Sequence, residues 1–336
     1  MRAFVITAPG EAAVHEVEPP VAGPGEVVVD VSRAGVCGTD IEFFTGEMQY
    51  LHDGFAEYPM RIGHEWAGTV SALGEGVDPH WLGRRVTGDT MLGCGECRRC
   101  HAGYQWVCEF RTEIGIRGGR PGALAEQLAV PVSALRPLPD SVDDALGALV
   151  EPGGNALRAV WGADLHPGDR ALVLGPGTIG LLAAMFARAA GAEVHLLGRS
   201  ARAIEFARGL GFENSWTDET LPADLPWDAV IDASNAPALP AKALDLVEPG
   251  RRVVYIGLAG SPSTIDTRTL ALKDVTAVGV LSASPGLTAA IEAYADGSID
   301  PRPLIAATVP LDELPAVLGG DRPRGAGPGP KVQVAL

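Results

Sequence analysis

The second half of the chain alternates apolar strand-like runs with helix-like stretches, and this alternation restricts the fold more than any other feature. The runs cover residues 171–174, 193–197, 229–232, 252–257 and 275–280. Several of them are apolar almost throughout, as expected for strands that are buried on both faces. Strands that alternate with helices predict a parallel sheet with helices on both sides, which is the α/β class.

A glycine-rich turn follows the first of these runs. Alone, its glycine spacing is a weak signal, but here a predicted strand precedes it and a predicted helix follows it. The glycines permit a tight turn and close approach of a pyrophosphate, and the helix N-terminus faces the phosphates. We therefore predict a dinucleotide site at Gly175, Gly177, Thr178, Ile179 and Gly180.

The second run ends in Gly198, Arg199 and Ser200, where an NAD-specific site would place an acidic residue for the ribose. A guanidinium and a hydroxyl suit a 2′-phosphate instead. The sequence therefore favours NADP as the cofactor, with NAD still possible. The alternative is that Arg199 is a solvated residue at a helix start that stacks on the adenine.

Residues 1–135 have a different character. Short strand-like runs such as 27–31 and 66–70 are separated by Gly and Pro, which predicts a β-rich unit. At 336 residues the chain is long enough for two domains. The tail after about residue 284 predicts a helix, a loop and one final strand at 331–334.

Four of the five cysteines are close together in the sequence. Thiolates at this spacing can surround one tetrahedral zinc ion, and an iron–sulfur cluster is the alternative. A closed site of this kind stabilises the fold and performs no chemistry. The predicted ligands of this structural zinc are Cys94, Cys97, Cys100 and Cys108.

The remaining cysteine, Cys37, lies in a Gly-rich segment upstream of His64 and Glu65. A thiolate, an imidazole and a carboxylate suit zinc, and three protein ligands leave one position open for a substrate. The alternative is a buried free cysteine with an unrelated core histidine.

Charge and targeting signals narrow the function further. Forty-two acidic residues against 26 Lys and Arg give a net charge of −16, which argues against a nucleic-acid or anionic-membrane partner. No apolar run reaches transmembrane length, and the N-terminus resembles a strand rather than a signal peptide. We therefore expect a cytoplasmic enzyme, whose cysteines are metal ligands or free thiols.

These motifs, in this order, resemble the zinc-dependent medium-chain dehydrogenase/reductases over nearly the whole chain. The resemblance implies a GroES-like catalytic domain at residues 1–150, with the structural zinc lobe at about 91–110. It also implies a Rossmann domain at 151–283 and a C-terminal segment, 284–336, that returns to the first domain. By the same resemblance, Cys37, His64 and Glu151 hold a catalytic zinc, and Glu65 is a further ligand or exchanges with water.

A narrower resemblance is to the glucose (aldose) 1-dehydrogenase branch, in the segments that begin at Cys37 and Cys108. It implies oxidation of a sugar hydroxyl, with hydride transfer to the nicotinamide and Thr39 passing the proton outward. A polyol, aminocyclitol or other secondary-alcohol substrate is the alternative. The segment 281–285 lacks the histidine and asparagine of glucose dehydrogenases. The family also implies a homodimer or homotetramer, and the residues expected to contact the substrate are Thr39, Glu42, Glu113 and Glu151.

Overall fold

The computed structural model describes residues 1–336, and its first half is built on a seven-stranded sheet. The longest strand, β3, occupies an inner position because its valines at 27, 29 and 31 are buried in one apolar cluster. The sheet order is β16-β17-β3-β4-β5-β9, and β8 pairs with β3. The bounds are β3 (Glu26–Gly35), β4 (Glu65–Leu73), β5 (Arg85–Gly88), β8 (Gln127–Pro131), β9 (Leu135–Pro137), β16 (Ile305–Pro310) and β17 (Lys331–Ala335). A separate hairpin consists of β1 (Arg2–Ala8) and β2 (Glu11–Glu16).

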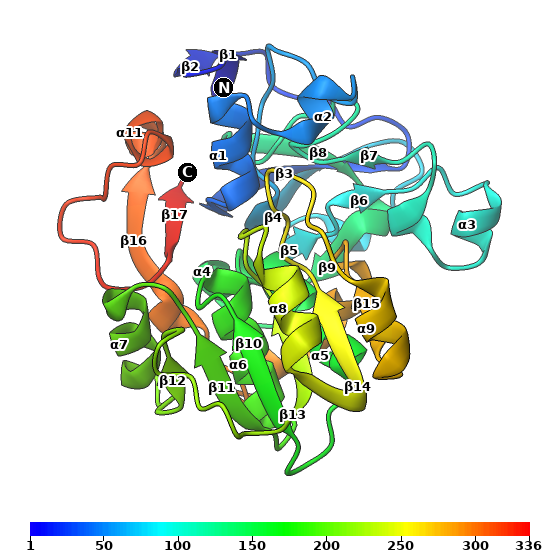
Figure 1. The fold of residues 1–336 in the computed structure, drawn as a ribbon. Coiled ribbons are helices and arrows are strands. Elements are labelled where there is room, and N and C mark those ends of the chain that lie inside the picture. The colour runs from blue at the N-terminus through cyan, green and yellow to red at the C-terminus, as the bar shows by residue number, and fades with distance from the viewer.

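The C-terminal segment closes this first sheet. Strand β17 runs antiparallel to β3, with Gln333 opposite Gly35, and β16 runs parallel to β17. In Figure 1 the orange and red strands lie beside the blue N-terminal elements. Only the final strand was predicted from the sequence. The sequence of β16, IAATVP, has no strong apolar run and ends in proline, so its strand character depends on pairing with β17.

The second sheet has six parallel strands in the order β12-β11-β10-β13-β14-β15. This is the Rossmann strand order: β11 and β12 are added on one side of β10, and β13, β14 and β15 are then added on its other side. All five predicted runs are strands, and the sixth strand is only two residues long. The bounds are β10 (Arg170–Leu174), β11 (Glu193–Leu197), β12 (Ser215–Trp216), β13 (Trp227–Asp232), β14 (Val247–Tyr255) and β15 (Thr276–Gly279). The α/β class with a β-rich first unit is thus confirmed.

The helices cover the sheets and connect them (Figure 1). Their bounds are α1 (Gly38–Thr45), α2 (Gln49–His52), α3 (Arg98–His101), α4 (Asp144–Gly147), α5 (Val150–Ala163), α6 (Thr178–Ala189), α7 (Ala201–Gly209), α8 (Leu239–Leu246), α9 (Thr267–Leu272), α10 (Leu287–Ala295) and α11 (Leu314–Leu318). None of them combines the length and the apolar character that a bilayer crossing requires.

A small lobe containing α3 projects from the body between β6 (Met91–Leu92) and β7 (Thr112–Glu113) (Figure 1). The Arg158 guanidinium of α5 lies over the Trp106 ring of this lobe, 5.0 Å from its centroid. The lobe is therefore also anchored on the helix that leads into the Rossmann sheet.

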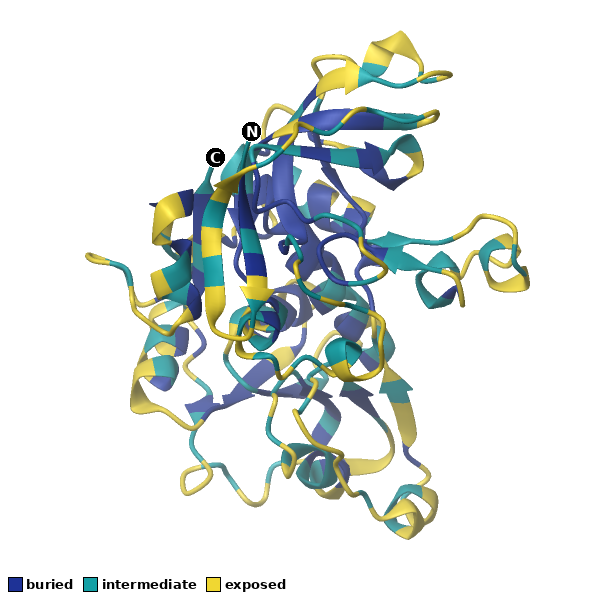
Figure 2. Ribbon diagram, turned by 90° about the horizontal axis from the view of Figure 1, so that it is seen from above, coloured by how far each residue is buried: buried dark blue, intermediate teal, exposed yellow.

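Buried residues are concentrated in the sheets and at the junction of the two halves (Figure 2). The largest apolar cluster has 34 buried residues and includes Ala67 and Leu138 of the first half beside the Rossmann helices. The two halves therefore share a continuous core. We propose 1–150, 151–283 and 284–336 as the domain division.

Candidate active site

Cys37, His64 and Glu65 meet at the junction of β3, α1 and β4. Their ligand atoms all lie within 4.8 Å of one another. Cys37 caps α1, directly after β3, and Glu65 begins β4, which pairs with β3. Glycine is required at position 35 because a Cβ there would lie 2.0 Å from Glu65 Oε2. The antiparallel pairing of β3 with β4 thus brings Cys37 close to His64 and Glu65, which follow it by 27 and 28 positions.

Asp40 fastens the two ligand segments to each other. Its Oδ2 accepts a hydrogen bond from the Cys37 amide at 2.8 Å, and its Oδ1 accepts one from the Gly63 amide at 3.2 Å. The side chain is fully buried, and burial raises its pKa. Asp40 therefore supports the ligand loops.

Lys331 of β17 forms a buried ion pair with Glu65, which was not anticipated from the sequence. Its Nζ donates to both oxygens of Glu65, at 2.8 and 2.7 Å, and to the Val36 carbonyl at 2.9 Å. Burial disfavours the charge on Lys331, but the charge and hydrogen bonds of Glu65 together with the charges of Cys37 and Asp40 outweigh it and raise the Lys331 pKa. A lysine in a predicted terminal strand carries no local signal for such a role, since only the β17–β3 pairing brings it to the site.

Glu151 is buried at the start of α5 but does not belong to the group of three. Its Oε1 accepts a hydrogen bond from Asn155 Nδ2 at 2.8 Å, one helical turn later. Burial raises the pKa of Glu151 to about 7, while nearby His64 favours the charged form. Its ligand role, implied by the family resemblance, remains a proposal.

The side chains present fit a zinc ion. A sulfur, an imidazole nitrogen and a carboxylate converge, which is the donor set that zinc prefers. Asp40, Glu65 and Glu151 place three carboxyl groups in the interior, with Lys331 as the buried ammonium beside them. Nδ1 of His64 is buried without a hydrogen-bond partner. A divalent cation would offset this negative charge.

Two of the residues proposed to contact substrate lie on α1, the helix that Cys37 caps. Thr39 and Glu42 are three positions apart on α1, so they share one face of the helix. Glu42 is half-buried, and burial raises its pKa.

Glu113 is buried in β7, and two side chains donate hydrogen bonds to its carboxylate. Arg111 Nε donates to its Oε1 at 2.7 Å, and the Tyr50 hydroxyl donates to the same oxygen at 3.4 Å. Two hydrogen bonds connect the strand of Glu113 to the metal-binding segment. The Ile114 amide donates to the Thr90 carbonyl, and Thr90 Oγ1 donates to the His64 carbonyl. Arg111 and Tyr50 are therefore polar neighbours that the sequence interpretation missed.

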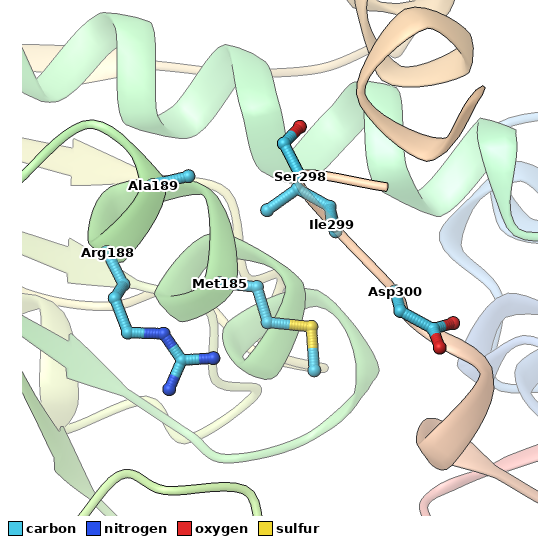
Figure 3. A pocket seen from close by; sticks show the side chains of 6 residues that line it. All are labelled: Met185, Arg188, Ala189, Ser298, Ile299 and Asp300. Carbon is cyan, nitrogen blue, oxygen red and sulfur yellow. The ribbon is translucent and has the colours of Figure 1, made fainter. Parts of the chain in front are cut away.

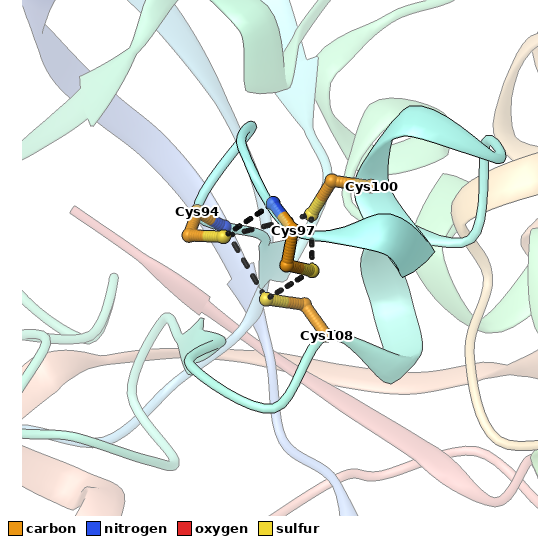
Figure 4. A group of neighbouring side chains, drawn as sticks. All are labelled: Cys94, Cys97, Cys100 and Cys108. Carbon is orange, nitrogen blue, oxygen red and sulfur yellow. Dashed lines mark hydrogen bonds between the residues drawn. The ribbon is translucent and has the colours of Figure 1, made fainter.

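The four remaining cysteines converge in the projecting lobe (Figure 4). Cys97 Sγ lies 3.6 Å from Cys100 Sγ and 3.7 Å from Cys108 Sγ, and Cys94 Sγ lies 4.0 Å from Cys100 Sγ. Four sulfurs about 2.3 Å from one tetrahedral zinc would be about 3.8 Å apart. The spacing therefore fits a single ion and leaves no room for an iron–sulfur cluster.

The glycine turn lies at the carboxyl end of the Rossmann strands. Gly175 follows β10 with φ +92°, and its amide donates to the Leu197 carbonyl of β11 at 2.9 Å. Gly177 caps α6, and a Cβ on it would meet no atom within 4 Å, so this face is open to a ligand. A Cβ on Gly180 would lie 1.9 Å from the Gly175 carbonyl oxygen, so close packing of helix and turn requires glycine. Thr178 and Ile179 form the first turn of α6.

The end of β11 lies beside this turn. Gly198 is buried against Pro176, and Arg199 is exposed. Ser200 caps α7, its Oγ accepting from the Ala203 amide at 3.1 Å. That bond uses a lone pair and leaves the hydroxyl proton free to donate.

Comparison with known proteins also indicates a zinc-dependent dehydrogenase. Residues 23–140 match the family model of the alcohol dehydrogenase GroES-like domain, and residues 178–296 match that of the zinc-binding dehydrogenases. An L-threonine 3-dehydrogenase from Deinococcus radiodurans is 30% identical over 296 residues, which are 83% of this chain and 82% of that protein.

Two solved structures are similar over 100% of this chain and 99% of the solved chain in each case. One is an Escherichia coli CFT073 protein described as a short chain alcohol dehydrogenase, in complex with NADH, with a TM-score of 0.91 and 25% identity. The other is a candidate zinc-binding dehydrogenase from Sinorhizobium meliloti 1021 bound to NADP, with a TM-score of 0.89 and 28% identity. The chain therefore belongs to the zinc-dependent medium-chain dehydrogenases, oxidoreductases that act on CH–OH donors.

Proposed function

We propose that this enzyme oxidises a hydroxyl group of a sugar, as glucose (aldose) 1-dehydrogenases do, with NADP as the preferred cofactor. The observation that carries the proposal is a polar group around one buried carboxylate, whose strand is connected through Thr90 to the His64 carbonyl. Glu113, Arg111 and Tyr50 form this group, and a site for a simple apolar alcohol would have no use for it.

Glu113 has one oxygen left for a ligand. Arg111 and Tyr50 both donate to Oε1, and Oε2 accepts no hydrogen bond from the chain. A sugar hydroxyl could donate to Oε2 in a charge-assisted hydrogen bond. Arg111 fixes the carboxylate in place, so that little side-chain entropy is lost when a substrate binds.

The chemistry is divided among a few side chains. A zinc ion held by Cys37, His64, Glu151 and, directly or through water, Glu65 would supply a Lewis acid that favours the ionised form of a hydroxyl. Thr39, two positions after Cys37 in the first turn of α1, can accept the hydroxyl proton and pass it outward. Glu42, one turn further along the same face, can hold a neighbouring hydroxyl.

The cofactor preference depends on Arg199 and Ser200. An exposed guanidinium and a free hydroxyl proton suit a 2′-phosphate, and the end of β11 offers no carboxylate for a ribose hydroxyl. One similar structure contains NADH and the other NADP, so the comparisons support either dinucleotide.

A secondary alcohol is the second candidate substrate class. The Deinococcus relative is named for oxidation of threonine, whose hydroxyl is a secondary alcohol. Polyols and aminocyclitols also carry secondary hydroxyls. Initial rates for glucose and other aldoses, sorbitol, an aminocyclitol, L-threonine and 2-propanol, each with NADP and NAD, test the proposal. The highest kcat/KM should be with an aldose and NADP, and a clear preference for L-threonine or 2-propanol would contradict it.

We also propose a homodimer, or a homotetramer built from it, that forms through β15. This strand is at the edge of the Rossmann sheet, pairs only with β14 and is largely exposed. An unpaired, exposed edge can pair with the same strand of a second copy. Sedimentation analysis tests this. The cytoplasm remains the compartment we propose, because thiolate ligands require reduced cysteines.

A further inference from the structure

A cavity of about 350 Å³ lies on the catalytic domain apart from the residues discussed above. Two segments, 56–61 and 116–121, form most of its wall, together with Val5 and Val17. None of the residues proposed to bind metal, cofactor or substrate lines it. Three arginines do: Arg61, Arg117 and Arg120.

Arg61 is a half-buried guanidinium without an anionic partner. Burial alone lowers its pKa, since no carboxylate is close enough to raise it. Removing a charged group from water is costly unless a counter-charge is present. An unpaired guanidinium in the wall of a cavity is therefore suited to bind an anion.

Arg117 presents its hydrogen-bond donors in a fixed plane. Its guanidinium lies over the Phe55 ring, 3.7 Å from the centroid, and 5.5 Å from the centroid of Tyr50. Stacking uses the face of the guanidinium and leaves the N–H groups at its edge available. The aromatic rings thus hold the side chain in position without satisfying its donors.

Acidic residues neutralise this wall only in part. Arg120 donates through one nitrogen to Glu26 Oε1 at 3.0 Å, which leaves its other donors available. Glu57 also lines the cavity, but its side chain is exposed and forms no salt bridge. Positive charge therefore predominates here, in a chain whose net charge is −16.

The two wall segments are joined through their backbones close to the metal-binding residues. The Gly118 amide donates to the Phe55 carbonyl, and the Gly122 amide donates to the Arg61 carbonyl, both at 2.9 Å. His64 follows Arg61 by three positions. A ligand that bridges Arg61 to Arg117 would hold these segments together beside the catalytic site.

A smaller cavity shows what such a site requires. It has a volume of about 140 Å³ and lies between α6 and residues 298–300, with Arg188 and Asp300 on opposite sides (Figure 3). Arg188 already donates to the Leu210 carbonyl, and Asp300 accepts from Arg302. One arginine and one aspartate line this cavity, so positive charge does not predominate there as it does in the larger one.

We propose that the cavity of Arg61, Arg117 and Arg120 binds the phosphate group of a small metabolite at a site separate from catalysis. A phosphate offers three oxygens and close to two negative charges, so that guanidiniums from both segments can contact it at once. A single carboxylate has only two oxygens and one charge, and it matches this wall less well.

Isothermal titration calorimetry with inorganic phosphate tests the proposal. The zinc-loaded enzyme is first saturated with NADPH, so that the dinucleotide site is filled, and ionic strength is held constant with chloride. We expect saturable binding that is about tenfold weaker in Arg61→Gln, the effect of losing one or two charge-assisted hydrogen bonds. Arg84→Gln, an exposed arginine of the same domain outside the cavity, should bind like the wild type.

Three results would overturn the proposal: no saturable binding, equal affinity in wild type and Arg61→Gln, or a loss of binding in Arg199→Ala instead. Acetate that binds as tightly as phosphate would overturn the choice of a phosphate ligand. If Arg61→Gln loses zinc or melts at a lower temperature, Arg117→Gln provides the same comparison from the other segment.

Discussion

Lys331 binds both carboxylate oxygens of Glu65 across 266 positions of sequence, with Nζ–O distances of 2.8 and 2.7 Å. Both side chains are almost completely buried. The pair joins the last strand of the chain to the first residue of β4, next to the metal-binding group. The C-terminal segment is therefore part of the active site.

Removing the lysine should destabilise the fold. Lys331→Met leaves the Glu65 carboxylate buried without its counter-charge, which costs about 3–5 kcal/mol of unfolding free energy. Lys242→Met is the control, because Lys242 forms an exposed ion pair with Asp218, worth about 0–1 kcal/mol. Urea unfolding of both variants in the Cys37→Ser background, where no zinc at the open site can supply a counter-charge to Glu65, measures both losses, and equal losses in the two variants would show that the buried pair contributes no more than an exposed one.

Protonation of Glu193 should make the Rossmann domain less stable in acid. Arg170 and His195 both donate to its carboxylate and lower its pKa from 4.5 to about 2. A lowered carboxyl pKa contributes stability above pH 4.5, and this contribution disappears as the pH falls towards 2. Melting temperatures between about pH 5 and about pH 3 should therefore fall less steeply in Glu193→Gln than in the wild type. The control is Glu205→Gln, which removes an exposed carboxylate of α7 and should keep the wild-type dependence of melting temperature on pH. The same wild-type dependence in Glu193→Gln would contradict this prediction.

Glu113 should discriminate between substrates. Glu113→Ala removes the acceptor Oε2 and should raise KM for the preferred sugar about tenfold. KM for 2-propanol, which has no second hydroxyl, should change little. Tyr50→Phe is the companion variant, since it removes one donor to Oε1 but keeps the carboxylate. An equal loss with sugar and 2-propanol in Glu113→Ala would mean that the carboxylate has a structural role.

Arg199 should determine the cofactor preference. The wild type should show a kcat/KM about one to two powers of ten higher with NADP than with NAD, from about 1–3 kcal/mol of contacts to the 2′-phosphate. Arg199→Ala should lose most of that preference and keep its activity with NAD. Arg202→Ala, one turn further into α7, is the control. A wild-type kcat/KM with NAD that equals or exceeds the value with NADP contradicts this interpretation of the β11 end.

Local patterns in the sequence were sufficient to predict the Rossmann half. Its strands are continuous apolar runs, and its cofactor turn is marked by glycines whose necessity is visible in the backbone, as at Gly180. The four cysteines were likewise interpretable because they are close in the chain, and their sulfurs do converge. In these regions the neighbours in sequence are also the neighbours in space.

The parts that were missed depend on contacts between distant segments. Lys331 reaches Glu65 only because β17 pairs with β3, and strand β16 is stabilised by β17 rather than by its own composition. Arg111 could have been noticed, since it is two positions from Glu113, but nothing local indicates that Tyr50 joins them. Side chains that act through tertiary pairing leave no periodic signal in the sequence.

The central claim is that one chain holds two zinc ions with different roles, and the zinc content of purified variants tests it most directly. Metal analysis should give two zinc ions per chain in fully active wild type. Cys37→Ser should retain one zinc and its fold and lose its activity, because only the open site is affected. Cys94→Ser should lose the closed four-thiolate site and unfold more easily, since such sites contribute directly to folding. One zinc ion per chain in fully active wild-type enzyme would contradict the account.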